Sequence, residues 1–136
     1  MAMQTFINLP VKDLTKATEF FRAIGFSFDP QFTDENATRM IVSDETSVML
    51  AVQPFFKGFI EPRDVADTSR NQEVIVGLSA ESREQVDELT EKALAAGAEP
   101  LGEPEDQGFM YMRGFRDLDG HQWSFIYMDM AAISEG

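Results

Sequence analysis

The sequence predicts an α+β fold made of two successive β-α-β-β-β modules. In each module a strand pattern is followed by an amphipathic helix pattern and then by three further strand patterns. The glycines that end the two predicted helices, Gly25 and Gly97, lie 72 residues apart in a chain of 136 residues. A period near half the chain length indicates a duplicated module, because a solenoid needs at least three repeats.

The length and composition fit a single domain over residues 1–136. Hydrophobic residues make up 43% of the chain, which is enough for one sizeable core and too little for two ordinary domains. We expect module 1 to cover about residues 1–53 and module 2 about residues 72–130, with a connector over residues 54–71.

Module 1 begins with a strand pattern at residues 6–9, which we expect to end at Pro10 because proline cannot donate to a sheet ladder. A helix follows, with Asp13 as its N-cap and Gly25 as its C-terminal stop. The apolar residues of this helix recur at helical spacing and should face a sheet; they are Leu14, Ala17, Phe20, Phe21 and Ile24. Three strand patterns then cover residues 26–32, 38–43 and 47–53.

Module 2 repeats this order, starting with a strand pattern at residues 73–78. Ser82 followed by Gln85 resembles a capping box that opens a second helix, and Gly97 ends that helix. The apolar face of the second helix consists of Val86, Leu89, Ala93 and Ala96. Strand patterns follow at residues 100–102, 109–115 and 122–128, and an Asp-Leu-Asp-Gly turn at residues 117–120 joins the last two.

The connector at residues 54–71 carries Phe55, Phe56 and Phe59, followed by a polar stretch. Irregular segments of this length often form lids or binding loops. Alternatively, the three phenylalanines simply pack the connector onto the sheet.

The charge balance argues against two classes of partner. There are 24 acidic and 11 basic residues, giving a net charge of −13, so the protein repels nucleic acid and anionic membranes. The chain has no cysteine, which excludes disulfides and thiolate chemistry. Because no apolar run approaches the roughly 18 residues that span a bilayer and the N-terminus has no signal-peptide pattern, we expect a cytoplasmic protein.

Two motifs resemble those of the vicinal oxygen chelate superfamily, which comprises glyoxalases, bleomycin resistance proteins and extradiol dioxygenases. The first is Leu-Pro-Val-Lys-Asp-Leu at residues 9–14, continued by Phe20-Phe21 and Gly25-Phe26. The second is Phe-Arg-Asp-Leu-Asp-Gly-His-Gln-Trp at residues 115–123, which is similar to the family's Asp-Pro-Asp-Gly-His turn. The resemblance implies eight strands in a U-shaped mixed sheet around a central cavity, usually completed as a homodimer.

The resemblance also implies where a metal would bind. In metal-using members, four inward-facing strand positions supply His, Gln or Glu. These positions fall here on Phe6, Leu50, Ile75 and Ser124, and none of the four is an ordinary metal ligand. A slipped register would add only the Glu73 carboxylate. We therefore expect no metal and no other cofactor, and we interpret the single histidine, His121, as structural because it directly follows a glycine turn.

The period of two along a strand extends the predicted cavity to further side chains. Asn8 should lie on the side of Phe6, Val48 and Val52 on the side of Leu50, and Gln122 and Ile126 on the side of Ser124. The alternate residues of the last strand should face the helices as core; they are Trp123, Phe125 and Tyr127.

Tyr111 and Arg113 alternate on the preceding strand and leave two alternatives open. If they point inward, they offer a hydroxyl and a guanidinium to a ligand. If they point outward, Arg113 compensates part of the negative charge of the acidic surface.

Two functions from different classes follow. The first is metal-free binding of a small organic molecule in the cavity, as in the bleomycin-resistance branch, with a cationic ligand favoured by the net charge. The alternative is a metal-dependent enzyme, either a lyase resembling lactoylglutathione lyase or a dioxygenase-like enzyme. Metal-free acid–base catalysis by Glu73 or Tyr111 is a third possibility, but the sequence offers neither residue a positioned partner.

Overall fold

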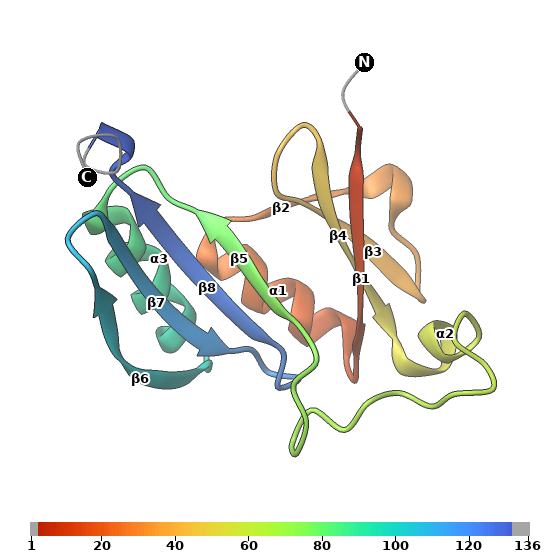
Figure 1. Cartoon of the computed structure of the whole chain (residues 1–136). Helices are drawn as coiled ribbons and strands as arrows, with labels where there is room; N and C mark the ends of the chain where they lie inside the picture. The colour runs from red at the N-terminus through yellow and green to blue at the C-terminus, as the bar shows by residue number, and fades with distance from the viewer. Residues whose placement is uncertain (1–2, 132–136) are drawn as a thin grey trace. The chain divides into compact units, whose positions relative to one another are not determined.

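The structure is a computed structural model that describes residues 3–131. The chain divides into two compact units, Met1–Asp67 and Thr68–Gly136. Each unit contains one β-α-β-β-β module, and each module forms its own four-stranded mixed sheet (Figure 1). The predicted α+β class and the two predicted modules are therefore confirmed.

The first unit has the strand order β1-β4-β3-β2, with β1 and β4 parallel and the other neighbours antiparallel. Its elements are β1 (Thr5–Val11), α1 (Leu14–Ile24), β2 (Ser27–Asp29), a 3-10 helix (Pro30–Phe32), β3 (Ala37–Ile41), β4 (Thr46–Val52) and α2 (Gln53–Lys57).

The second unit repeats this topology with the strand order β5-β8-β7-β6. The first and last strands of this module, β5 and β8, are again parallel. Its elements are β5 (Ile75–Ser79), α3 (Arg83–Ala95), β6 (Glu99–Asp106), β7 (Met110–Arg116) and β8 (Gln122–Met128). Helix α3 packs against β7 and β8 and covers one face of this sheet (Figure 1).

Two predicted strand ends in module 1 are wrong. Strand β1 continues through Pro10, which pairs with Ala51, because β1 lies at the edge of its sheet, where a missing N–H is tolerated. The strand predicted over residues 26–32 stops at Asp29, whose carboxylate accepts a hydrogen bond from the backbone N–H of Gln31 and caps a 3-10 helix that starts at Pro30.

Helix α1 has the predicted caps and packs its predicted face. The Asp13 carboxylate accepts a hydrogen bond from the Lys16 N–H at 3.0 Å, and Gly25 closes the helix with φ +125°. Ala17, Phe20, Phe21 and Ile24 are buried. Because α1 packs against β3 and β4, these side chains form the core of the first unit together with Met40, Val48 and Leu50.

The turn between β7 and β8 is built around the buried carboxylate of Asp117. It accepts hydrogen bonds from the backbone N–H groups of Asp119 (2.9 Å) and His121 (3.0 Å) and from Trp123 Nε1 (2.9 Å). Burial raises the pKa of this carboxyl above its ordinary value. His121 is itself buried in the turn, which supports its interpretation as a structural residue.

Two alternatives were predicted for the connector, a lid and a segment packed onto the sheet, and the structure bears on the second. Its start forms α2, which packs against β1 and β4, so part of the segment does pack onto the sheet. Phe55 and Phe59 pack edge to face on each other at 5.2 Å between ring centroids and remain largely exposed. A lid role for this segment stays a prediction.

Strand β6 is an edge strand with unusual content. Its sequence, Glu-Pro-Leu-Gly-Glu-Pro-Glu-Asp, holds four acidic residues and two prolines, and its pairing with β7 is irregular between Leu101 and Glu105. Over residues 3–131, no helix is both long and apolar enough to cross a membrane.

We predict that Gly25→Ala destabilises the protein by about 1–2 kcal/mol, because a side chain strongly disfavours the positive φ at this position. Gly58→Ala is the matched control, because Gly58 has φ −60°, which alanine readily adopts. This variant should raise the free energy of unfolding by about 0.4–1 kcal/mol, because alanine makes the unfolded chain stiffer. Urea denaturation of both variants measures the difference. Equal shifts of the two midpoints would contradict the assigned conformation of Gly25.

Candidate functional site

The pairing register of the first sheet defines one candidate face. Phe6 pairs with Ser47 and Asn8 with Met49, so these four side chains point to the same side of the sheet. Strand β3 adds two more residues, because Arg39 pairs with Met49 and Ile41 with Ser47. We call this side the Phe6 face; it carries Phe6, Asn8, Arg39, Ile41, Ser47 and Met49.

The three predicted cavity residues of β4 lie on the opposite side of the sheet. Leu50 pairs with Leu9, Val48 with Ile7, and Val52 with Val11. Leu50 and Val48 are 0% exposed, because they pack in the core beneath α1. The prediction that Val48, Leu50 and Val52 share a side with Phe6 is therefore wrong by one residue in register. Strand β4 is apolar at nearly every position, so alternation could not show which side faces the helix.

Arg39 is the cationic group of the Phe6 face, and the sequence analysis missed it. Asp29, which pairs with Arg39, lies on the same side of the sheet. The guanidinium carbon of Arg39 lies 5.5 Å from the ring centroids of both Phe6 and Phe32. Its Nε donates to Ser47 Oγ at 2.8 Å, and its Nη1 lies 3.5 Å from Asp29 Oδ2. Its neighbours on the strand, Thr38 and Met40, are both buried on the helix side, so Arg39 points to the other side.

The second sheet has a corresponding face around Ser124. Ile75 pairs with Gln122, and Ser124 lies between Gly77 of β5 and Gly114 of β7. The same register brings Met112 beside Ile126 and Arg116 beside Gln122. We call this side the Ser124 face; it carries Ile75, Gly77, Met112, Gly114, Arg116, Gln122, Ser124 and Ile126.

Several predictions about the second sheet agree with this register. Ile75, Gln122 and Ser124 do share a side, whereas Trp123 and Phe125 are buried on the side of α3. That these residues, with Phe6 and Asn8, line a ligand cavity stays a prediction. Glu73 is exposed and lies two residues before β5 begins, so the structure gives it no strand register.

The inward alternative for Tyr111 and Arg113 is wrong. Both residues lie on the α3 side of β7, where the Tyr111 hydroxyl donates to Asp87 at 2.7 Å. Arg113 donates to Asp87 at 3.2 Å and to Glu91 at 2.9 Å. The hydrogen bond to Asp87 raises the pKa of Tyr111, so this phenol stays protonated and is not available as a general base near neutral pH. The sequence missed these contacts because it gave no way to align α3 with β7.

The donor set does not fit a metal of the kind that the superfamily uses. The strand positions at which the resemblance places metal ligands hold Phe6, Leu50, Ile75 and Ser124. Leu50 is buried in the core, and the β4 residues on the Phe6 side are Ser47 and Met49. Across residues 3–131, no group of three or more His, Cys, Asp or Glu side chains could hold a metal ion. A phenyl ring, an aliphatic chain, hydroxyls and a thioether do not form a site for a divalent cation.

The chain belongs to the Glyoxalase/Bleomycin resistance protein/Dioxygenase superfamily, whose family profile matches residues 4–125. Among solved structures, it is similar to hypothetical protein SA1046 from S. aureus, with 31% identity, 93% of each chain covered and a TM-score of 0.75. Among curated protein sequences, none matches this chain.

Two more distant neighbours share the fold and carry names of enzymes or resistance proteins. The fosfomycin resistance protein FosX from Listeria monocytogenes is 21% identical, with 93% of each chain covered and a TM-score of 0.65. Lactoylglutathione lyase from Agrobacterium tumefaciens is 18% identical, with 93% of this chain and 92% of that chain covered and a TM-score of 0.67. At these identities the similarity shows the fold alone.

We predict that Arg113→Met lowers the free energy of unfolding by about 1 kcal/mol, because it removes two ion pairs of a partly buried guanidinium. Lys92→Met is the matched control, since it removes the same charge from an exposed pair with Glu88 and should cost at most about 0.5 kcal/mol. Urea denaturation compares the two variants. A larger loss in Lys92→Met would contradict the role of Arg113 as a strand-to-helix clamp.

Proposed function

We propose that this protein binds a small organic molecule, on the Phe6 face or on the Ser124 face, without the help of a metal. The observation that carries the proposal is that Phe6 and Ile75, at positions where the resemblance places metal ligands, are large exposed apolar side chains, with the Ser124 hydroxyl on the same side of the second sheet as Ile75. Side chains of this kind contribute apolar contact area and a hydroxyl, which are the usual parts of a small-molecule site.

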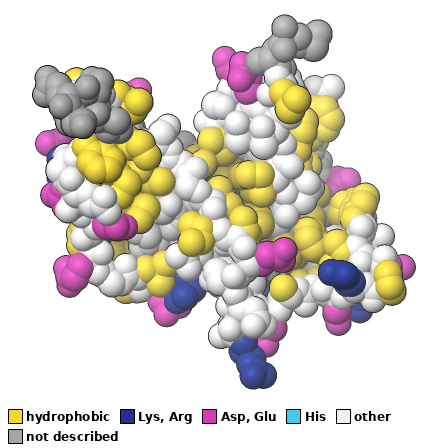
Figure 2. All heavy atoms as spheres, in the orientation of Figure 1, with side chains coloured by type: hydrophobic (Ala, Val, Ile, Leu, Met, Phe, Trp, Pro, Cys, Tyr) yellow, Lys and Arg dark blue, Asp and Glu magenta, His cyan; other side chains and the backbone are white. Residues whose placement is uncertain are grey.

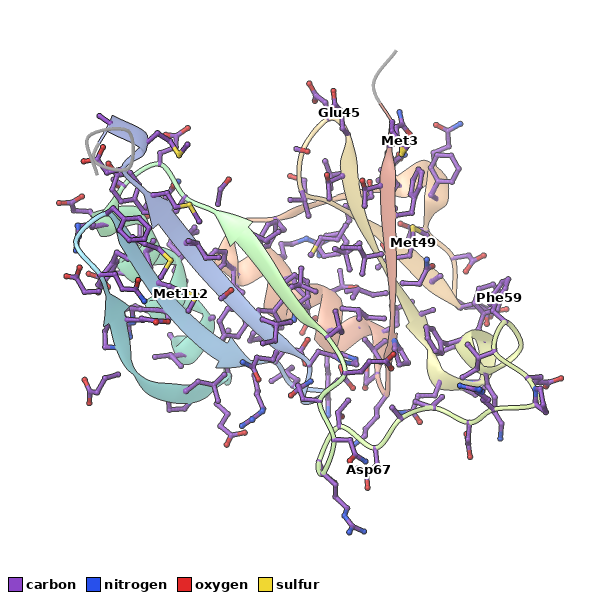
Figure 3. All side chains as sticks on the ribbon, viewed as in Figure 1. Met3, Glu45, Met49, Phe59, Asp67 and Met112 are labelled. Carbon is purple, nitrogen blue, oxygen red and sulfur yellow. The ribbon has the colours of Figure 1, made fainter. Side chains whose placement is uncertain are left out.

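The surface properties of the two faces support this proposal. Phe6 is 50% exposed and Ile75 is 58% exposed. Exposing large apolar side chains of a folded sheet to water is unfavourable and therefore unusual. In the view of Figure 2, hydrophobic side chains gather over both sheets. Met49 on β4 and Met112 on β7, both labelled in Figure 3, add flexible thioether side chains that adapt to ligands of varied shape.

The metal-dependent alternatives, a lactoylglutathione lyase-like or dioxygenase-like reaction, have less support. Both reactions polarise a substrate oxygen on a metal, and the side chains at the relevant positions offer no suitable set of donors. Metal-free acid–base catalysis is also poorly supported, because the Tyr111 hydroxyl faces α3 and donates a hydrogen bond to Asp87.

A homodimer in the cytoplasm is part of the same proposal. Apart from the acidic, proline-containing strand β6, the two sheets leave three edge strands, β1 and β2 in the first unit and β5 in the second. Unpaired strand edges favour association, and closed twofold dimers are the commonest outcome.

We predict that the purified protein retains far less than one transition metal per chain after dialysis, because the ligand positions hold no donor set. Elemental analysis measures the metal content. A thermal-shift screen of small organic molecules, run with and without EDTA, then tests binding, because a ligand of the folded state raises Tm. Retention of about one zinc, nickel or iron per chain, or ligand shifts that EDTA abolishes, would refute metal-independent binding.

We also predict a molar mass of twice the chain mass in multi-angle light scattering at micromolar concentration, because paired sheet edges lower the free energy of the dimer. Dilution of the sample to nanomolar concentration serves as the control for reversible association. A single-chain mass across the whole range would exclude the dimer.

A further inference from the structure

We infer that the Phe6 face binds organic carboxylates through Arg39, which is held between the rings of Phe6 and Phe32. The inference rests on the proposed small-molecule function and names the chemical class of the ligand. It opposes the preference for cations that the net charge of −13 favours, because a local guanidinium within contact distance outweighs a diffuse field screened by salt.

The two phenylalanine rings hold the guanidinium in place. Each ring centroid lies 5.5 Å from the guanidinium carbon of Arg39, one ring coming from β1 and the other from the 3-10 helix after β2. A guanidinium held against two rings keeps its charge and its planar fork while losing side-chain freedom before any ligand arrives. Less entropy is then lost on binding, which favours affinity.

Arg39 also keeps hydrogen-bond donors available. A guanidinium has five N–H donors, of which Nε–H is taken by Ser47 Oγ at 2.8 Å. Nη1 reaches Asp29 only at 3.5 Å, and within residues 3–131 Nη2 makes no hydrogen bond. The carboxylate of Asp29 is itself shared, because its Oδ1 accepts from the Gln31 N–H.

Comparison with Arg113 shows how weakly Arg39 is engaged by a carboxylate. Arg113 is engaged by two carboxylates, at 2.9 and 3.2 Å, and those contacts use both of its terminal nitrogens. Arg39 has one carboxylate at 3.5 Å, although the exposed fraction of its side chain is similar, 21% against 19% for Arg113. Arg113 is therefore a satisfied structural residue, whereas Arg39 has capacity for a further acceptor.

The surroundings of Arg39 define the rest of the ligand. Phe6 and Phe32 are each about half exposed, at 50% and 53%, so they offer apolar surface beside the guanidinium. A carboxylate matches the planar fork of arginine, and an apolar or aromatic body attached to it would cover the exposed rings. The class of ligand is thus a carboxylate joined to a hydrophobic group, rather than a small inorganic anion.

Isothermal titration calorimetry on the full-length protein tests this with three probes of matched size: 4-phenylbutyrate, 4-phenylbutylamine and 4-phenylbutanol. We expect the carboxylate to bind most tightly, and Arg39→Gln to weaken its binding by at least about tenfold. Arg39→Lys should recover only part of the affinity, because lysine keeps the charge but loses the planar fork.

Arg22→Gln is the matched control, because Arg22 also lies over a ring, 5.4 Å from the centroid of Phe28, and its loss changes the net charge equally. It should leave carboxylate binding unchanged. Phe32→Leu, which keeps Arg39 and alters an exposed ring, should weaken the carboxylate several-fold and serves as a second variant if Arg39→Gln does not fold.

Three results would overturn the inference: tighter binding of the amine than of the carboxylate, equal losses in Arg22→Gln and Arg39→Gln, or no effect of Arg39→Gln and Phe32→Leu. Binding of the alcohol or the amine, without the carboxylate, would leave the proposed function standing while rejecting Arg39 as its anion contact. The absence of binding by all three probes at millimolar concentration would reject both.

Discussion

Parallel pairing between the first and last strands of each module decides which side chains are available to a ligand. In the first sheet it places Leu9 beside Leu50, and in the second it places Val76 beside Trp123, so one side of each sheet is committed to a helix. The other side receives every alternate residue, because successive side chains of a strand point in opposite directions. The composition of the Phe6 and Ser124 faces follows from those two registers.

The sequence predicted the elements of this fold better than the faces of its strands. Helix caps have local signatures, and Asp13, Gly25 and Ser82 act as their positions indicate. Register is not local: it depends on which neighbour a strand pairs with, and a one-residue error moves a whole set of side chains across the sheet. Leu50 shows this, because an almost wholly apolar strand gives no alternation to read.

Charged residues on strands were the hardest to place, and they matter most for the candidate site. Arg39 and Arg113 occupy similar positions in their modules' strand sequences, each between residues of the opposite face. They point to opposite sides of their sheets, Arg113 toward the helix of its module and Arg39 away from it. Acidic side chains of α3 meet Arg113, whereas Arg39 meets two phenylalanines and a serine. Contacts between distant segments of this kind require tertiary structure.

The composition of β6 has a consequence for how chains can associate. Asp106 and Glu99 are paired with Arg83 and Arg116, which leaves the carboxylates of Glu103 and Glu105 to repel a second copy of the same edge. Pro100 and Pro104 have no backbone N–H to donate to an added strand. Sheet growth from this side is therefore blocked both electrostatically and chemically. The protein can present exposed apolar side chains on its faces without those sheets becoming templates for fibril formation along β6.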